Sequence, residues 1–449
     1  IPMSDDAAPA KTGLHPLEKG LAEESSITLA SEVEREIHVF KDPTSELRSQ
    51  GTIEDFFANF RDRYDRLKRI IAQRVDGKGI ISIQATKYEQ TLSKETQDRT
   101  VKIVGMVSDK RTTQGGNLSF ELEDPTGQTS VIVLKKDTAL MKKAELVLLD
   151  QIVCVEGQPV SNEMIIAKDL FLPDIPLTER TNHADEDICV ALISDIHFGS
   201  KQFIESAFRR FIDWLNGRED LEKNLAQSVK YVVIAGDLVD GIGVYPKQHD
   251  DIKIFNLDDQ FKGLASILKE IPEYIHVIVT PGNHDGVRNA IPRPSIEERF
   301  INPLISEGLS VTSLGCPCQF SLHGVSLLVY HGDSLIDMIG ALPTQGLEES
   351  FEAMREMIRG RHLAPTYGKE TPIAVEPRDW LVIERVPDIL HCGHTHVNCI
   401  GKYRKTLIVN SGTFQNQTDY QRSIGIIPTP GIVPIVNLRT LNVKQLRFI

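Results

Sequence analysis

The chain reads ICVALISDIHFG over residues 188–199, an apolar run followed by an aspartate and, two residues later, a histidine. A short apolar run of this kind is typical of a buried β-strand. In layered α/β sheets, ligands bind at the carboxyl ends of the strands. The stretch therefore predicts a strand of such a sheet together with the first part of a functional site.

Four further stretches repeat this arrangement, each an apolar run that ends in side chains able to bind metals. They read YVVIAGDLVD over 231–240, IHVIVTPGNHD over 275–285, SLLVYHGD over 326–333 and DILHCGHTH over 388–396. A single Asp or His after a strand is usually a cap or turn residue. Five such stretches in one domain predict instead that their side chains converge. Six further histidines lie outside the pattern, and core or surface roles are expected for them: His183, His249, His276, His323, His362 and His391.

The mixture of carboxylate, amide oxygen and imidazole indicates the chemistry. These ligands suit Mn²⁺, Fe²⁺ or Zn²⁺ better than they suit metals that prefer thiolates. Two ions about 3.5–4 Å apart can clamp both the attacking and the leaving oxygen of a phosphate, and a nearby histidine can protonate the leaving oxygen. We therefore predict a phosphoesterase with two divalent ions, most readily Mn²⁺, with Fe²⁺, Zn²⁺ or Mg²⁺ as alternatives.

The sequence before this region predicts a second domain. Residues 1–50 are expected to form a polar linker, and residues 51–97 a connecting segment with a helix whose apolar face begins at Ile53. Residues 98–175 contain five short runs rich in β-branched residues, with a helix expected over 135–143, which is typical of the small barrel called the OB-fold. A linker over 176–187 then leads into an α/β domain over 188–449, a layered β-sandwich flanked by helices.

The barrel is expected to contact protein rather than DNA, although DNA binding stays an alternative. Barrels that bind single strands use aromatic platforms and basic residues. Here Phe120 and Phe171 are the only aromatic residues in the expected strands, and the charges nearly balance.

Composition limits how the chain can bind nucleic acid. Its 449 residues include 50 basic and 63 acidic ones, a net charge of −13. This argues against coating nucleic acid by bulk charge, but a partner can supply a basic groove. The 6 cysteines are too few for a disulfide scaffold. Because the cysteines are few and no apolar run approaches the length of a membrane span, a cytoplasmic protein without a membrane partner is expected.

The five motifs resemble, in order and completely, those of the calcineurin-like metallophosphoesterases, over residues 188–412. The resemblance implies a role for each motif residue. One ion would be held by Asp195, His197 and His396. The other would be held by Asn283, His331 and His394, with Asp237 bridging the two ions. His284 would donate the proton, oriented by Asp240.

Details of the motifs indicate which branch of this family the chain resembles. Protein phosphatases of this family usually have Arg after the second Asp and Glu after Asn-His, whereas this chain has Gly241 and Asp285. The SDIHFG opening over 194–199 is more similar to the nuclease branch. A barrel before the phosphoesterase domain resembles the B-subunits of replicative polymerases. Eukaryotic B-subunits have lost metal ligands, but every ligand position is filled here. The chain thus resembles, over roughly 55–449, the small subunits of archaeal family D DNA polymerases.

This resemblance implies a 3′→5′ exonuclease that proofreads for a separate large catalytic subunit, as a heterodimer within a DNA-directed DNA polymerase. DNA 3′ ends, preferably single-stranded, would be the substrate, and a sliding clamp is a further candidate partner. Three alternatives stay open: a stand-alone DNA repair nuclease, a catalytically silent scaffold, and an enzyme for small phosphodiesters. Four cations that follow site motifs are predicted to contact the substrate backbone: Lys201, Lys247, Arg288 and Arg293.

Overall fold

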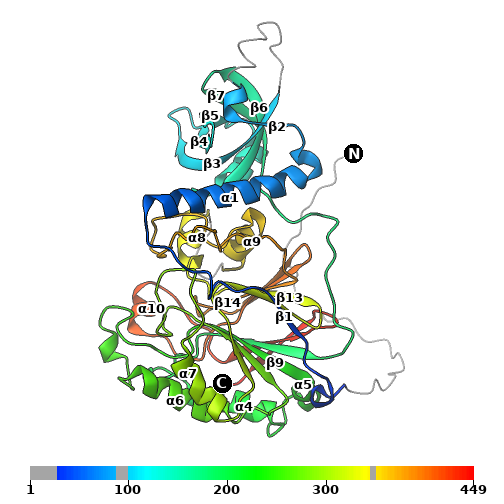
Figure 1. The fold of residues 1–449 in the computed structure, drawn as a ribbon, viewed down its shortest axis with the longest axis vertical. Coiled ribbons are helices and arrows are strands. Elements are labelled where there is room, and N and C mark those ends of the chain that lie inside the picture. Colours follow the sequence, from blue (N-terminus) through cyan, green and yellow to red (C-terminus); the bar gives the residue numbers. More distant parts are fainter. Residues whose placement is uncertain (1–27, 87–99, 344–349) are drawn as a thin grey trace.

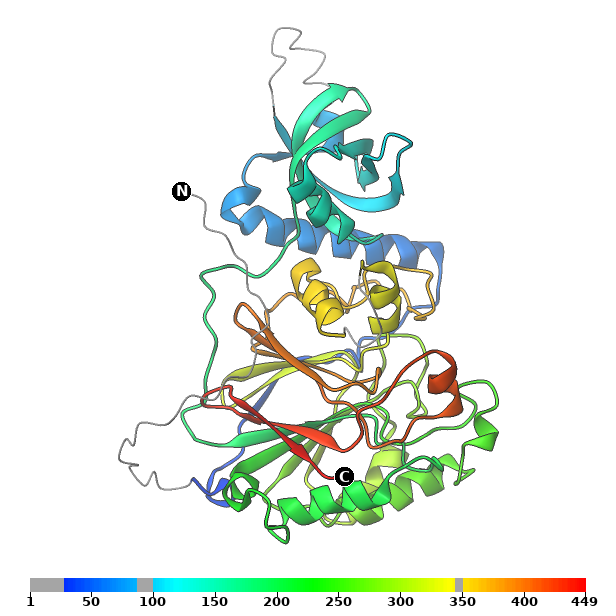
Figure 2. The same ribbon diagram turned by 180° about the vertical axis from the view of Figure 1, so that it is seen from behind.

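The computed structural model describes residues 28–86, 100–343 and 350–449. A small barrel lies at one end of the molecule and a β-sandwich with flanking helices at the other (Figures 1 and 2). Helix α1 (Ile53–Gln73) crosses between them. This is the predicted fold class, an α/β sandwich preceded by an OB-fold barrel.

The sandwich consists of two six-stranded sheets. The first has the order β11-β10-β9-β8-β17-β18, and its strands span Val311–Ser313 (β11), His276–Thr280 (β10), Val229–Ala235 (β9), Cys189–Ile193 (β8), Ile432–Asn437 (β17) and Val443–Arg447 (β18). The second has the order β1-β12-β13-β14-β16-β15, and its strands span Ile37–Lys41 (β1), Cys318–Leu322 (β12), Val325–Val329 (β13), Ile389–Cys392 (β14), Thr406–Asn410 (β16) and Cys399–Tyr403 (β15).

Apolar residues fill the space between the two sheets and the outer face of each. Val190 and Val233 of the first sheet share a buried core with Val329 and Ile389 of the second. The helices that cover the first sheet are α4 (Glu205–Leu215), α5 (Lys223–Ser228), α6 (Leu257–Leu268) and α7 (Glu298–Ser306). Those over the second are α8 (Leu335–Ala341) and α9 (Ser350–Gly360). Since every central strand is buried on both faces, the site strands read as continuous apolar runs.

The prediction that residues 1–50 form a linker is wrong for the part that the structure describes. Residues 28–50 pack along the sandwich. Within them, β1 pairs antiparallel with β12 and forms the edge strand of the second sheet. The backbone N–H groups of Arg48 and Ser49 donate to the buried carboxylate of Glu376. An edge strand of five residues is too short to give a sustained apolar period, and its sequence IHVFK mixes apolar and polar residues. Residues 1–27 lie outside the described part of the chain.

The barrel closes as predicted, through the order β3-β4-β5-β7-β6 and an additional pairing of β3 with β6. Its elements are β2 (Ile80–Ile81), β3 (Val101–Thr112), β4 (Leu118–Asp124), β5 (Gly127–Val133), α3 (Thr138–Glu145), β6 (Ile152–Ser161) and β7 (Met164–Phe171). Strand β6 begins shortly after the chain turns at Asp150, whose φ is 60°. Strand β2 adds to β3 from outside the expected boundaries.

Helix α1 joins the two domains through a buried charged group. Nε of Arg63 donates to Oδ2 of Asp379 at 2.7 Å, and Nη1 donates to the carbonyl of Pro365 at 2.7 Å. His362 also donates to Oδ2 of Asp379, at 2.9 Å. Burial lowers the pKa of His362 to about 4, so its ring is neutral. Tyr64, Leu67 and Ile71 of α1 pack with barrel residues in a small apolar cluster.

We expect Arg63→Ala to destabilise this junction by about 3–5 kcal/mol, because it leaves the Asp379 carboxylate buried without its guanidinium partner. Urea denaturation measures the change. Arg61→Ala is the matched control on the same helix, since Arg61 pairs with Asp65 at the exposed surface, and it should change stability little. Equal losses for the two variants would contradict the assignment of Arg63 as the residue that links the domains.

Candidate metal centre

The five motifs converge at one edge of the sandwich, as the sequence predicts. Strands β8, β9 and β10 are parallel neighbours in the first sheet, and β13 and β14 are parallel neighbours in the second. Each motif occupies the loop directly after its strand. The two sheets therefore deliver their polar side chains to the same place, beside a pocket of about 300 Å³ whose lining includes His197, Asp237 and Asn283.

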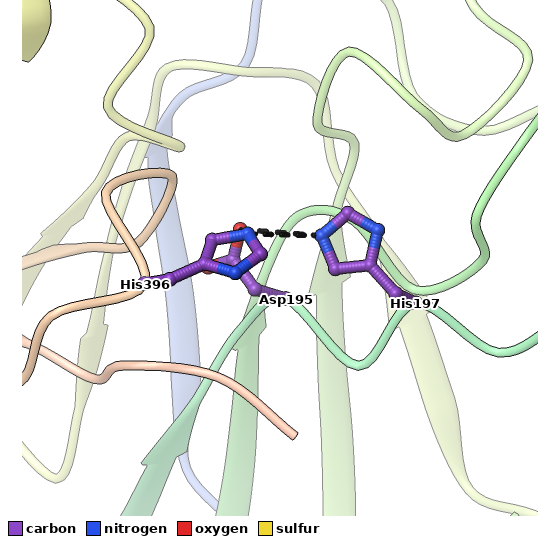
Figure 3. A group of neighbouring side chains, drawn as sticks. All are labelled: Asp195, His197 and His396. Carbon is purple, nitrogen blue, oxygen red and sulfur yellow. Dashed lines mark hydrogen bonds and ion pairs between the residues drawn. The ribbon is translucent and has the colours of Figure 1, made fainter. Parts of the chain in front are cut away.

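One ligand group contains Asp195, His197 and His396 (Figure 3). Nε2 of His396 lies 3.3 Å from Oδ1 of Asp195 and 3.1 Å from Nε2 of His197. Nε2 of His197 lies 3.9 Å from the same Asp195 oxygen. All three side chains are buried and direct their free nitrogen and oxygen atoms toward a common point.

A second group contains Asp237, His331 and His394. Nε2 of His331 lies 3.3 Å from Oδ2 of Asp237, 3.1 Å from Nδ1 of His394 and 3.2 Å from Oδ1 of Asn283. Asp237 also faces the first group, because its Oδ2 is 3.6 Å from Nε2 of His197. The seven predicted ligands thus form two groups that share Asp237.

The nitrogen and oxygen atoms that face each other in the two groups are better suited to binding a cation than to hydrogen bonding with one another. Oδ1 of Asp195 is buried and has no hydrogen-bond partner, which is costly for a carboxylate. The carbonyl of Ala235 accepts from Nδ1 of His331 at 2.8 Å, which leaves Nε2, directed into the site, as the nitrogen that an ion would bind in place of a proton. A divalent ion in each group would satisfy these electron pairs.

The pKa shifts of Asp237 and His331 also favour the binding of a cation beside the shared carboxylate. Burial alone would raise the pKa of Asp237, but the surrounding histidines, His331 first, hold it well below its usual value. Burial alone would lower the pKa of His331, but Asp237 raises it to about 10. The centre of the pocket is therefore an ionised carboxylate that attracts cations.

The backbone is forced into an unusual conformation to bring these side chains together. Five of the ligands have positive φ angles between 51° and 68°: Asp195, His197, Asp237, His394 and His396. This left-handed region is uncommon for residues other than glycine, and such strain gathers at functional sites. Glycines allow the close approach: a Cβ on Gly282 would lie 2.1 Å from Oδ1 of Asp237, and one on Gly393 would lie 2.3 Å from Oδ2 of Asp195.

The structure corrects how Asp240 acts. We expected its carboxylate to orient His284, but it is the backbone carbonyl of Asp240 that accepts from Nδ1 of His284, at 2.6 Å. The carboxylate instead faces Nδ1 of His197 at 3.2 Å, which leaves Nε2 of His197 free for a metal. A carboxylate behind a ligand histidine fixes the ring and raises its basicity. Asp240 therefore holds His284 through its backbone carbonyl and the predicted ligand His197 through its carboxylate.

This geometry predicts that Asp240→Asn weakens metal binding by about 10- to 100-fold, as expected for loss of the carboxylate behind a ligand histidine. Calorimetric titration with Mn²⁺ measures the affinity. Asp250→Asn, at an exposed aspartate in the following loop, is the control and should bind normally. If Asp240→Asn keeps full affinity and loses only rate, its carboxylate orients the proton donor after all.

The four basic side chains predicted to contact the substrate lie in different surroundings. Arg293 is fully buried and pairs with Asp333, so the prediction that it meets the substrate backbone is wrong. Arg288 donates to the carbonyl of Pro292 and to Glu376, which leaves little of it free. Lys201 and Lys247 are exposed beside the site loops and stay candidates. The sequence could not separate these roles, because the partner acids lie far away in the chain.

Sequence reasoning missed three glutamines that support the centre. Gln248 and Gln415 each approach the carboxylate of Asp240 at 3.3 Å, and Gln421 lies 2.8 Å from Nδ1 of His396. The Thr418-to-Gln421 spacing is a capping-box signature, which indicates a helix start. That signature could locate α10 (Asp419–Ser423) but not its contact with His396.

Two known protein families match the chain, one in each of its two domains. Residues 190–399 match the family of the B-subunits of DNA polymerases alpha and epsilon, and residues 101–167 match the OB-fold nucleic acid binding domain. These two matches, in this order along the chain, indicate the class, a small subunit of a DNA polymerase.

Similar proteins identify the family to which the chain belongs. The DNA polymerase II small subunit of Methanocaldococcus jannaschii is 39% identical over 421 residues, 93% of this chain and 69% of the relative. That of Methanothermobacter thermautotrophicus is 38% identical over 92% of this chain and 83% of the relative. The chain belongs to the DNA polymerase II small subunits, the small subunits of archaeal family D DNA polymerase.

A more distant similarity adds nothing to this assignment. A solved structure described as a novel archaeal phosphodiesterase covers 58% of this chain and 99% of its own, with 12% identity and a TM-score of 0.31. That score is too low to support an inference. Within the described residues, no helix combines the length and apolar character that crossing a membrane requires.

Proposed function

We propose that this chain is a 3′→5′ exodeoxyribonuclease that proofreads for the polymerase. The observation that carries the proposal is the complete ligand set: all seven positions hold metal-binding side chains, and these side chains face one another in two groups that share a carboxylate. A silent scaffold has no need of strained backbone and unpaired buried oxygen atoms at this place.

In this proposal the chain holds two divalent ions, with Mn²⁺ the preferred metal. Asp195, His197 and His396 would bind one, and Asn283, His331 and His394 the other, with Asp237 between them. When bound, such ions supply Lewis-acid stabilisation of the charge that develops on a phosphodiester and lower the pKa of water. The ligand side chains fix where the phosphate of a 3′-terminal nucleotide lies.

His284 is the proposed proton donor. Its Nδ1 donates to the Asp240 carbonyl, so the ring is oriented by the backbone. Its Nε2 lies 3.8 Å from Oδ2 of Asp237, and the side chain is partly exposed toward the pocket. A proton on Nε2 can pass to the leaving 3′ oxygen of the penultimate nucleotide. The same distances would also allow His284 to bind an ion, and the two roles predict different variants.

The proposed partner is the large catalytic subunit, which would supply most of the DNA groove. Phe120 is buried in the barrel core, and Phe171 packs beneath Arg74. Neither ring is therefore available as a stacking platform, which supports protein contact rather than DNA contact for the barrel. The net charge of −13 points the same way.

A panel of substrates tests the proposed activity. With Mn²⁺, the purified chain should release mononucleotides from single-stranded DNA at low salt, more slowly from duplex, and faster when the large subunit is added. Hydrolysis of 4-nitrophenyl phosphate without any action on DNA would overturn the proposal. Tight binding to duplex DNA at physiological salt, with no gain from a partner, would favour a stand-alone repair nuclease.

A further inference from the structure

Two tyrosines form a stacked pair on one side of the metal pocket. The rings of Tyr245 and Tyr420 have centroids 5.8 Å apart and planes inclined by 28°. Both line the pocket. The Tyr245 ring centroid lies 6.1 Å from that of His284, and Tyr420 is 48% exposed. The pair therefore presents an open aromatic face one ring away from the proposed proton donor.

Both rings are fixed relative to the metal centre. The Tyr245 hydroxyl donates to Oδ2 of Asp251 at 3.0 Å, which anchors the far end of that ring. Tyr420 belongs to α10, which begins at the capping box of Thr418. Its neighbour Gln421 lies 2.8 Å from Nδ1 of His396. The aromatic face is thus tied to a ligand on one side and adjoins His284 on the other.

The rest of the pocket offers little that could hold a polyanion. Besides the tyrosines, the lining includes the apolar side chains of Val244, Ile424 and Ile426 and the acidic side chains of Asp333, Asp337 and Glu370. Within the part of the chain that the structure describes, no Lys or Arg lines this pocket. Because carboxylates repel phosphates, this lining attracts an entering strand through the metal-binding centre and the aromatic face rather than through basic side chains.

We propose that Tyr245 and Tyr420 form a base-binding platform on which the terminal base of a single-stranded 3′ end stacks, so that its phosphate reaches the ligand groups. This inference rests on the proposed nuclease function. Stacking tolerates every base, since each has a π-face, and a proofreading site must accept any misinserted nucleotide. A base that is still paired and stacked in duplex is unavailable to the platform, which selects frayed ends.

Binding tests the platform without hydrolysis. The full chain is titrated with a single-stranded oligonucleotide that carries 2-aminopurine at its 3′ terminus and phosphorothioate terminal linkages. Stacking should quench the fluorescence on binding. Tyr420→Ala should abolish the quench and weaken affinity by about 5- to 150-fold, the range that base–aromatic stacking supports, whereas Tyr420→Phe should retain both. Phe255→Ala is the control, because Phe255 is equally aromatic and 64% exposed but does not line the pocket.

An abasic 3′ terminus separates base stacking from a structural role of α10. Wild type should bind and cleave the abasic end less well than a normal end, by the factor that Tyr420→Ala costs on the normal end. On the abasic end, Tyr420→Ala should cause no further loss. If Tyr420→Ala loses equally on both ends, or on neither, the platform is refuted. If wild type binds DNA through Tyr420 but never cleaves it, the proposed hydrolysis fails while the platform stands.

Discussion

Asp237→Ala should lose both bound metal and nuclease activity, with less than one ion per chain against two in wild type. Asp237 is the only ligand that faces both groups, since its Oδ2 lies 3.3 Å from Nε2 of His331 and 3.6 Å from Nε2 of His197. Removing it takes away the negative charge that offsets two cations at once. Elemental analysis of the purified variant measures the bound metal, and digestion of labelled DNA measures the activity.

The control for this variant is Asp258→Ala, at an exposed aspartate in the first turn of α6. It should keep both ions and full activity. A circular dichroism spectrum like that of wild type establishes that Asp237→Ala is folded. If Asp237→Ala retains two ions, the shared-carboxylate arrangement is wrong, and the two ligand groups act as separate sites.

His284→Ala should keep both ions and lose rate by about 10²- to 10⁴-fold, the usual contribution of a general acid. The ring contributes its Nε2 toward the pocket while Nδ1 is held by a backbone carbonyl, so its removal disturbs no ligand. Metal analysis and single-turnover cleavage, performed on the same preparation, separate the two effects. His249→Ala, at an exposed histidine in the neighbouring loop, should change neither.

The alternative role of His284 has a different signature. His284 groups with His197 and Asp237 closely enough to contribute to an ion. If His284→Ala loses metal as completely as Asp237→Ala, then His284 is a ligand, and the proton donor must be another group. Retention of full activity would remove His284 from the chemistry altogether.

The fold and the convergence of the motifs could be predicted because their signals are local. Each site strand is a short apolar run, and its ligands follow within a few residues of the strand's end. Parallel neighbours bring such residues together whatever the rest of the chain does. The barrel has similarly local signals, since β-branched runs alternate with turn residues around Gly116 and Gly127. The C-terminal apolar stretch that begins at Gly431 likewise forms a strand, β17.

The errors arise where a residue's role depends on a distant partner. Arg293 looks like a free cation in the sequence, but Asp333 lies 40 residues away and pairs with it in the interior. The motif pattern associates Asp240 with His284, yet the folded loop turns its carboxylate toward His197. On α1, Ile53 and Phe57 remain 73% and 76% exposed, because the helix meets the sandwich through neighbouring positions, Phe56 and Asn59.

The central claim is that the two ligand groups degrade DNA from its 3′ end, and one measurement tests it most directly. A 5′-labelled primer with a matched or mismatched 3′ terminus is incubated with the chain and Mn²⁺, with and without the large subunit. We predict a ladder of successively shorter labelled products, faster for the mismatched end and for single-stranded DNA, and absent for Asp237→Ala. Release of the labelled 5′ nucleotide first, or equal cleavage by wild type and Asp237→Ala, would contradict the claim.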